Sequence, residues 1–225
     1  LQVYLRQSLH QTTIKNAEGK KTMIKYIIGL FIATALVWSL IPVQAELSLY
    51  HSLIYKIGVL RNQQRLAQYA NVTYCGKTVS VTANHVGGEI AAIVPNAVLI
   101  AANRDYDIAI YEKLGLGDAS PLASILPSPF DDVYIPTFVW MNDDVVVYKY
   151  SVIGYNIKET LVQGILFFGA SGSGVYNKDG EYLGPVLTLQ PGPGFDRSTK
   201  QHSGIVGIGR TDKLIELFTK EVCGK

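Results

Sequence analysis

The chain has 225 residues, 48% of them hydrophobic, which is enough for one domain with a sizeable core. Its net charge is +2, but residues 1–25 hold five lysines or arginines against one glutamate, so the other 200 residues have a net charge of −2. A folded part without basic excess gives nucleic-acid binding little support. With 21 glycines and 14 tyrosines, the composition favours β structure with tight turns.

The first 45 residues carry a pattern typical of an export signal. Residues 1–22 form a polar leader that we expect to be disordered. In residues 23–45, Met23 and a lysine precede an apolar run, and Val43-Gln44-Ala45 offers the small residues that a signal peptidase recognises. The segment therefore predicts a secreted or periplasmic protein, or a membrane tether through residues 26–43 if the signal stays uncleaved. Residues 46–225 are left as the folding domain.

Short runs of strand-forming residues, separated by turns, follow in the domain. They are expected over 53–60, 69–74, 78–82, 89–94, 97–102, 108–111, 133–140, 145–152, 160–168, 175–177, 181–189 and 204–209. Cys75-Gly76-Lys77 and Lys178-Asp179-Gly180 are turn signals, and residues 190–201 read as a surface loop.

Only the end of the domain shows helical periodicity. Thr211 is a candidate cap, and Leu214, Ile215, Phe218 and Val222 share one face. Many short strands and one terminal helix indicate an all-β barrel protein. The two cysteines, Cys75 and Cys223, are too few for a disulfide scaffold, and one bridge or two free thiols are both open.

Three motifs fit one chemistry. Gly169-Ala170-Ser171-Gly172-Ser173-Gly174 follows an apolar run, and its glycines allow a turn that presents a serine hydroxyl beside backbone amides. A flexible linker is the alternative, but a linker would not be embedded between the apolar pairs Phe167-Phe168 and Val175-Tyr176. His85 ends a β run in TANHV. Asp107 enters the apolar run in DIAI, where a carboxylate needs a partner that His85 would provide.

Taken together, these motifs resemble those of the trypsin-like serine proteases. TANHV is similar to their histidine motif, DIAI to their aspartate motif and GASGSG to their serine motif, in the order His, Asp, Ser. The serine motif is followed by SGSGVYNKDGEYLGPV and GIVGIGRTDKLIELF, a layout similar to the HtrA (Deg) and glutamyl-endopeptidase branch, without a PDZ module. Ala170 replaces the acidic residue of the vertebrate enzymes, so activation by a new N-terminal amine is not expected.

The resemblance implies a fold of two antiparallel six-stranded β-barrels with a C-terminal helix. It also implies a serine endopeptidase acting on polypeptides through His85, Asp107 and Ser171 and an acyl-enzyme intermediate, with no cofactor and no metal. The amides of Gly169 and Ser171 would form the oxyanion hole, and residues 184–189 would pair with the substrate backbone. The implied substrate-binding side chains are those of Ile165, Leu166, Phe168, Val186, Leu187 and Thr188.

The pocket residues predict an apolar preference for the residue before the cut. None of them is an aspartate that would favour basic substrates, and His202 in the last loop is the one residue that could change this. Two other functions compete with this one. A non-catalytic trypsin-like fold, acting as a peptide-binding or viral structural component, would have lost the three residues that this chain keeps. An α/β-hydrolase would need the order Ser, Asp, His and a βαβ pattern.

Overall fold

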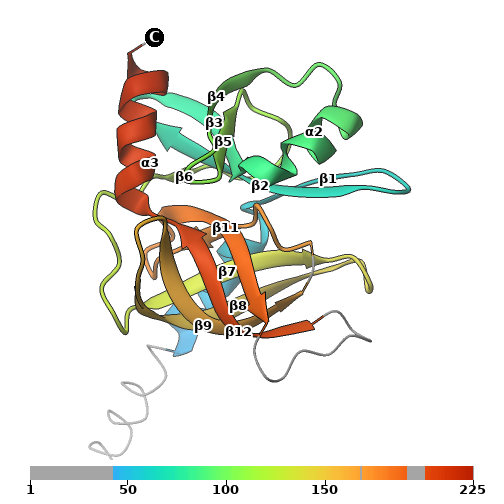
Figure 1. The fold of residues 1–225 in the computed structure, drawn as a ribbon. Coiled ribbons are helices and arrows are strands. Elements are labelled where there is room, and N and C mark those ends of the chain that lie inside the picture. Colours follow the sequence, from blue (N-terminus) through green and yellow to red (C-terminus); the bar gives the residue numbers. More distant parts are fainter. Residues whose placement is uncertain (1–42, 168, 192–200, 225) are drawn as a thin grey trace, which may run out of the picture. The chain divides into compact units, whose positions relative to one another are not determined.

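A computed structural model describes residues 43–167, 169–191 and 201–224. The chain divides into two compact units, Leu1–Ser48 and Leu49–Lys225. The described part of the first unit is the start of a helix over residues 43–54, so the predicted leader and most of the 23–45 segment lie outside the described residues. The second unit is mostly β and holds every strand described below (Figure 1).

The first sheet of the second unit is open. Its path is β1-β2-β3-β5-β4, with antiparallel neighbours, and the short β6 pairs with β2 in parallel. The strands are β1 (Ile57–Arg61), β2 (Leu66–Tyr74), β3 (Lys77–Ala83), β4 (Leu99–Asn103), β5 (Ile108–Tyr111) and β6 (Ser120–Pro121). Between β3 and β4 lie the 3₁₀ turn η1 (Asn84–Val86) and the helix α2 (Gly87–Ile93).

The second sheet closes into a six-stranded barrel because β10 pairs with both β11 and β7. The order around the barrel is β10-β11-β12-β9-β8-β7. The strands are β7 (Asp132–Val139), β8 (Asp144–Tyr155), β9 (Glu159–Phe167), β10 (Gly174–Tyr176), β11 (Tyr182–Pro191) and β12 (Gln201–Gly209). The prediction of two six-stranded barrels is therefore confirmed for one, and corrected to an open mixed sheet for the other.

The helix α3 (Thr211–Phe218) follows β12 and continues as a π-helical turn, η2 (Thr219–Cys223). Leu214, Phe218 and Val222 are buried in the core of the first sheet, as their spacing predicted. The expected cap differs, because Thr211 is the first helical residue and its hydroxyl donates to the carbonyl of Leu183 instead. Figure 1 shows this helix standing beside the first sheet.

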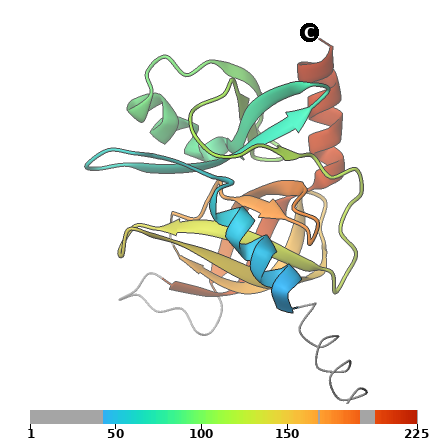
Figure 2. The same cartoon turned by 180° about the vertical axis from the view of Figure 1, so that it is seen from behind.

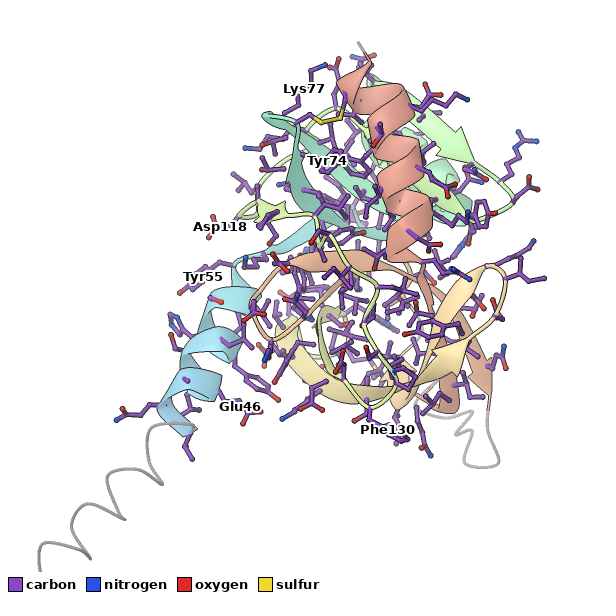
Figure 3. All side chains as sticks on the ribbon, turned by 90° about the vertical axis from the view of Figure 1, so that its left-hand side faces the viewer. Glu46, Tyr55, Tyr74, Lys77, Asp118 and Phe130 are labelled. Atoms are coloured by element: carbon purple, nitrogen blue, oxygen red, sulfur yellow. A yellow bond between two sulfur atoms is a disulfide. The ribbon has the colours of Figure 1, made fainter. Side chains whose placement is uncertain are left out.

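A disulfide joins Cys75, in the β2–β3 turn, to Cys223 at the end of η2. It resolves the open question about the two cysteines in favour of one bridge. Figure 3 shows its yellow bond beside the terminal helix, close to Tyr74 and Lys77. The Lys77 ammonium donates to the carbonyl of Val222, which ties the same turn to the helix a second time.

One segment expected to be a strand is helical, and a second one is a strand only over its second half. Residues 89–94 lie largely in α2, where Ile90 is the buried residue and the alanines beside it are exposed. Residues 53–60 contain the end of the first helix, and β1 begins only at Ile57. The 178–180 turn and its hairpin are confirmed, whereas most of the predicted 190–201 loop lies outside the described residues.

Candidate functional site

His85 and Asp107 meet at one end of the first sheet. His85 lies in η1, directly after β3, and Asp107 directly precedes β5. Because Ala83 of β3 pairs with Ile108 of β5, the residues just beyond these strand ends are neighbours. The Asp107 carboxylate contacts the His85 ring at Nδ1 (2.6 Å) and accepts a bond from the His85 amide (2.9 Å).

This two-point contact fixes both the place and the tautomer of the imidazole. With a carboxylate facing Nδ1, that nitrogen carries the proton, and Nε2 is left as an acceptor. The hydrogen bond to Asp107 raises the pKa of His85, and the negative charge of Asp107 acts in the same direction against desolvation. The side chains are 47% (His85) and 30% (Asp107) exposed, so the pair is open to solvent on one side.

Asp105, the other aspartate of the motif, is used differently. Its amide donates to the side chain of Asn103 in the turn before β5. Asp107 has φ of +52°, a left-handed conformation that a non-glycine residue rarely adopts. Its own carbonyl accepts a bond from the Asn84 amide at 2.8 Å, which holds the strained residue in place.

Ser171 lies in the turn between β9 and β10. Gly172, with φ of +86°, presses this turn against the first sheet: a Cβ there would lie 2.2 Å from both the Gln68 carbonyl and the Thr82 hydroxyl. Thr82 belongs to β3, the strand that leads to His85. Ser171 is half-buried, and in the described part of the chain no hydrogen bond joins its hydroxyl to His85.

Ser173, the second serine of the motif, points inward. It is fully buried, and its hydroxyl donates to Oε1 of Gln68 at 2.8 Å. Its environment is that of a structural hydroxyl.

Gln68 is the residue of this region that the sequence analysis missed. Its side chain is 0% exposed and lies between the two sheets. Its Nε2 donates to the carbonyls of Gly169 (2.7 Å) and Phe138 (3.1 Å), and its Oε1 accepts from the amide of Phe138 and the hydroxyl of Ser173. A glutamine inside an otherwise apolar run was the available signal, but the predicted strand began only at Tyr69.

The backbone of the serine turn leaves two amides unused. The amides of Ala170, Gly172 and Ser173 donate to backbone carbonyls at 2.8–3.2 Å. Among the described residues, the amides of Gly169 and Ser171 donate none. Both belong to the turn that carries the Ser171 hydroxyl, and two such donors are what an oxyanion site requires.

The predicted substrate-binding residues are divided by the structure. The side chains of Leu166, Val186 and Leu187 are buried in hydrophobic clusters, and that of Leu187 packs with Ala83 and Val86 beside His85. Ile165 and Thr188 are exposed, and Thr188 donates to the buried Glu159 at 2.6 Å. Phe168 and the side chain of His202 lie outside the described residues. Their part in substrate binding stays a prediction.

Tyr150 of β8 fixes the end of β9 where this pocket is expected. Its hydroxyl accepts from the Ile165 amide (3.0 Å) and donates to the Ile165 carbonyl. Its ring occupies the space that a Cβ on Gly164 would need. Burial raises the pKa of Tyr150 to about 12, so the phenol stays neutral across the physiological range.

The described ranges contain neither a candidate metal site nor a candidate membrane span. No cluster of three or more His, Cys, Asp or Glu side chains there could hold a metal ion. No helix in those ranges is both long and apolar enough for a membrane span.

Solved structures resemble the chain although its sequence matches no family model and no curated protein. The HtrA-type protease AlgW, solved with a tripeptide, superposes with a TM-score of 0.55 at 17% identity, over 76% of this chain and 62% of AlgW. A serine endoprotease of Yersinia pestis gives 0.54 at 15%, over 77% of this chain and 66% of that one. Rv3671c of M. tuberculosis, in an inactive form, gives 0.53 at 10%, over 77% and 89%.

The chain has the trypsin-like serine protease fold. At these identities the likeness establishes the fold alone. The chain spans about two thirds or less of AlgW and of the Yersinia endoprotease.

Proposed function

We propose that the chain is a serine endopeptidase with Ser171 as nucleophile, His85 as general base and Asp107 as the residue that orients His85. One observation carries the proposal. The Asp107 carboxylate binds both the ring and the backbone of His85, which directly follows β3, and Gly172 presses the Ser171 turn against Thr82 of that strand. An imidazole with Nδ1 held by a carboxylate and Nε2 left as an acceptor is what a general base requires.

The reaction proposed is acyl transfer in two stages. The Ser171 hydroxyl attacks the scissile carbonyl while Nε2 of His85 takes its proton, and the imidazolium then protonates the leaving amine. Water attacks the acyl-enzyme by the same route. The amides of Gly169 and Ser171 would stabilise the oxyanion, which is consistent with their being free of backbone partners in the described part of the chain.

The acyl part of the polypeptide would lie along β11 as an added strand, with its last side chain toward Ile165 and Thr188. Apolar residues such as Val, Ala or Leu would be preferred there. Modest selectivity is expected, since one methylene in an apolar pocket is worth roughly 1–3 kcal/mol.

The proposed place of action is outside the cytoplasm, either released or tethered through residues 26–43. The Cys75–Cys223 disulfide supports it, because structural disulfides persist in oxidising compartments. N-terminal sequencing of the mature protein tests the proposal. A chain beginning at Glu46 means cleavage, an intact chain in the membrane fraction means a tether, and an intact chain in the cytosol contradicts both.

Labelling with a fluorophosphonate probe tests the activity itself. The purified full chain should be labelled, whereas Ser171→Ala should not be. A folded wild-type chain that neither reacts with the probe nor cleaves a peptide library would instead indicate a non-catalytic trypsin-like fold.

A further inference from the structure

A pocket of about 470 Å³ opens beside the Ser171 turn. Gly169 forms one wall, the β1–β2 hairpin a second and the β7–β8 hairpin a third. Figures 1 and 2 show these two hairpins projecting side by side from the same side of the domain. The lining residues that matter for its chemistry are Arg61, Arg65, Leu66, Phe138 and Trp140.

The two hairpins are held together at the rim. The guanidinium of Arg61 pairs with the Asp143 carboxylate at the tip of the β7–β8 hairpin and lies 5.5 Å from the centre of the Phe138 ring. At its base, Leu66 lies next to Gly169, because a Cβ added to that glycine would be 3.3 Å from it. The pocket therefore extends from the rim of the two hairpins down to the proposed oxyanion site.

The position of the pocket assigns it to one end of the substrate. Among the described residues, its lining contains none from β9, β11 or β12, the strands proposed to hold the acyl part. A side chain that enters it therefore belongs to the leaving part of the polypeptide, after the scissile bond.

The chemistry of the lining selects an apolar group. Leu66, Phe138 and Trp140 provide the apolar surface, and the Trp140 side chain is exposed (55%). The cations at the rim are already neutralised, Arg61 by Asp143 and Arg65 by Glu89 at 2.9 Å. An indole face open to solvent gains most from stacking against an aromatic or large aliphatic side chain.

We infer that this pocket is a specificity site for a large apolar residue, aromatic or leucine, just after the cut, with Trp140 as its main contact. The inference rests on the proposed endopeptidase function and adds a second determinant to it. Trp140 touches the substrate without touching the reacting atoms.

Two matched substrates test it on the full chain in detergent. One is the methyl ester of acetyl-Ala-Ala-Leu, whose leaving group, methanol, is too small to reach the pocket. The other is a set of quenched fluorescent peptides with the same acyl part and Phe, Leu, Ala, Gly or Glu after the cut. We expect wild-type kcat/KM to be about tenfold higher for Phe or Leu than for Gly.

Trp140→Ala should abolish most of this preference while leaving methyl ester hydrolysis within about twofold of wild type, because the lost contact reaches only the leaving part and methanol is too small to make it. Met141→Ala is the matched control, since Met141 is its exposed neighbour (49%) outside the lining, and it should change neither substrate. Equal rates for all five peptides, a preference for Glu, or parallel losses on both substrates in Trp140→Ala would overturn the site alone. Failure of probe labelling and of all hydrolysis would overturn the endopeptidase function beneath it.

Discussion

The Nε2 of Gln68 donates a 2.7 Å hydrogen bond to the carbonyl of Gly169, so a buried residue of the first sheet holds the serine turn of the barrel. The same side chain exchanges two further bonds with the backbone of Phe138. Each of its polar atoms is thus used at a point where the two sheets meet. Without it, the Phe138 amide and the Ser173 hydroxyl would lose a buried acceptor.

Gln68→Ala should therefore destabilise the domain and weaken catalysis together. Leaving buried polar groups unpaired costs about 1–3 kcal/mol each, so we expect a loss of about 2–4 kcal/mol in the free energy of unfolding. Urea denaturation measures it. Gln63→Ala, an exposed glutamine of the β1–β2 hairpin, is the control and should change stability by under about 0.5 kcal/mol. Equal effects of the two substitutions would contradict the role of Gln68.

Catalysis should depend on the hydroxyl of Ser171. Ser171→Ala should lower kcat by about 10⁴–10⁶ and abolish fluorophosphonate labelling. Ser173→Ala should still be labelled, because the Ser173 hydroxyl is buried and hydrogen-bonded to Gln68. The same variant should be less stable than wild type. Labelling that persists in the first variant and disappears in the second would refute the assignment of the nucleophile.

The His85–Asp107 pair predicts the pH dependence of the reaction. Only neutral His85 can act as base, and its pKa is raised above 6.5, so kcat/KM should rise with pH to a midpoint above 6.5. Asp107→Asn should lower that midpoint and reduce kcat by about 10⁴. The pH profile of kcat/KM for the methyl ester in both proteins checks this, with Asp105→Asn as the control that should keep the wild-type midpoint.

The sign of the linked stability effect is opposite. A histidine whose folded pKa is raised adds stability that is fully present below the unfolded pKa and is lost as the pH rises through the folded one. The free energy of unfolding of wild type should therefore exceed that of Asp107→Asn by a smaller margin as the pH increases above 6.5. Stability differences that grow with pH in this window would contradict the pairing.

Reduction of the Cys75–Cys223 bridge should destabilise the domain strongly. The bridge spans 148 residues, and closing so long a loop is worth about 5 kcal/mol in the chain-entropy account. Guanidinium unfolding with and without reductant measures the difference. The double variant Cys75→Ser, Cys223→Ser should unfold like the reduced wild type and be indifferent to reductant.

Much of the fold could be predicted because strands leave short apolar runs and turns leave glycine signals. The run 108–111 is confirmed as β5, whose four residues are all buried, and Cys75-Gly76 is confirmed as a turn in which both residues have positive φ. The strand predicted over residues 89–94 was wrong. A short run with one buried isoleucine has no clear period, and two adjacent alanines favour the helix. Closure of one sheet and not the other depends on pairing between distant strands, which local sequence does not encode.

The candidate site was predicted from residue types in turns, which can be read directly from the sequence. The role of Gln68 could not be found in this way, since it depends on β2 passing beneath a turn 101 residues away. The same holds for the pocket at Trp140, which exists only where two separate hairpins meet.

The packing of α3 on the first sheet has a consequence for the order of folding. Leu214, Phe218 and Val222 complete the apolar core around Val72 and Val79, which are formed some 140 residues earlier in the chain. Until residues 211–223 have been synthesised, the part of this core that the three side chains cover stays exposed. The domain therefore cannot reach its native state while it is still being made, and an emerging chain must be kept from aggregating until its last helix arrives.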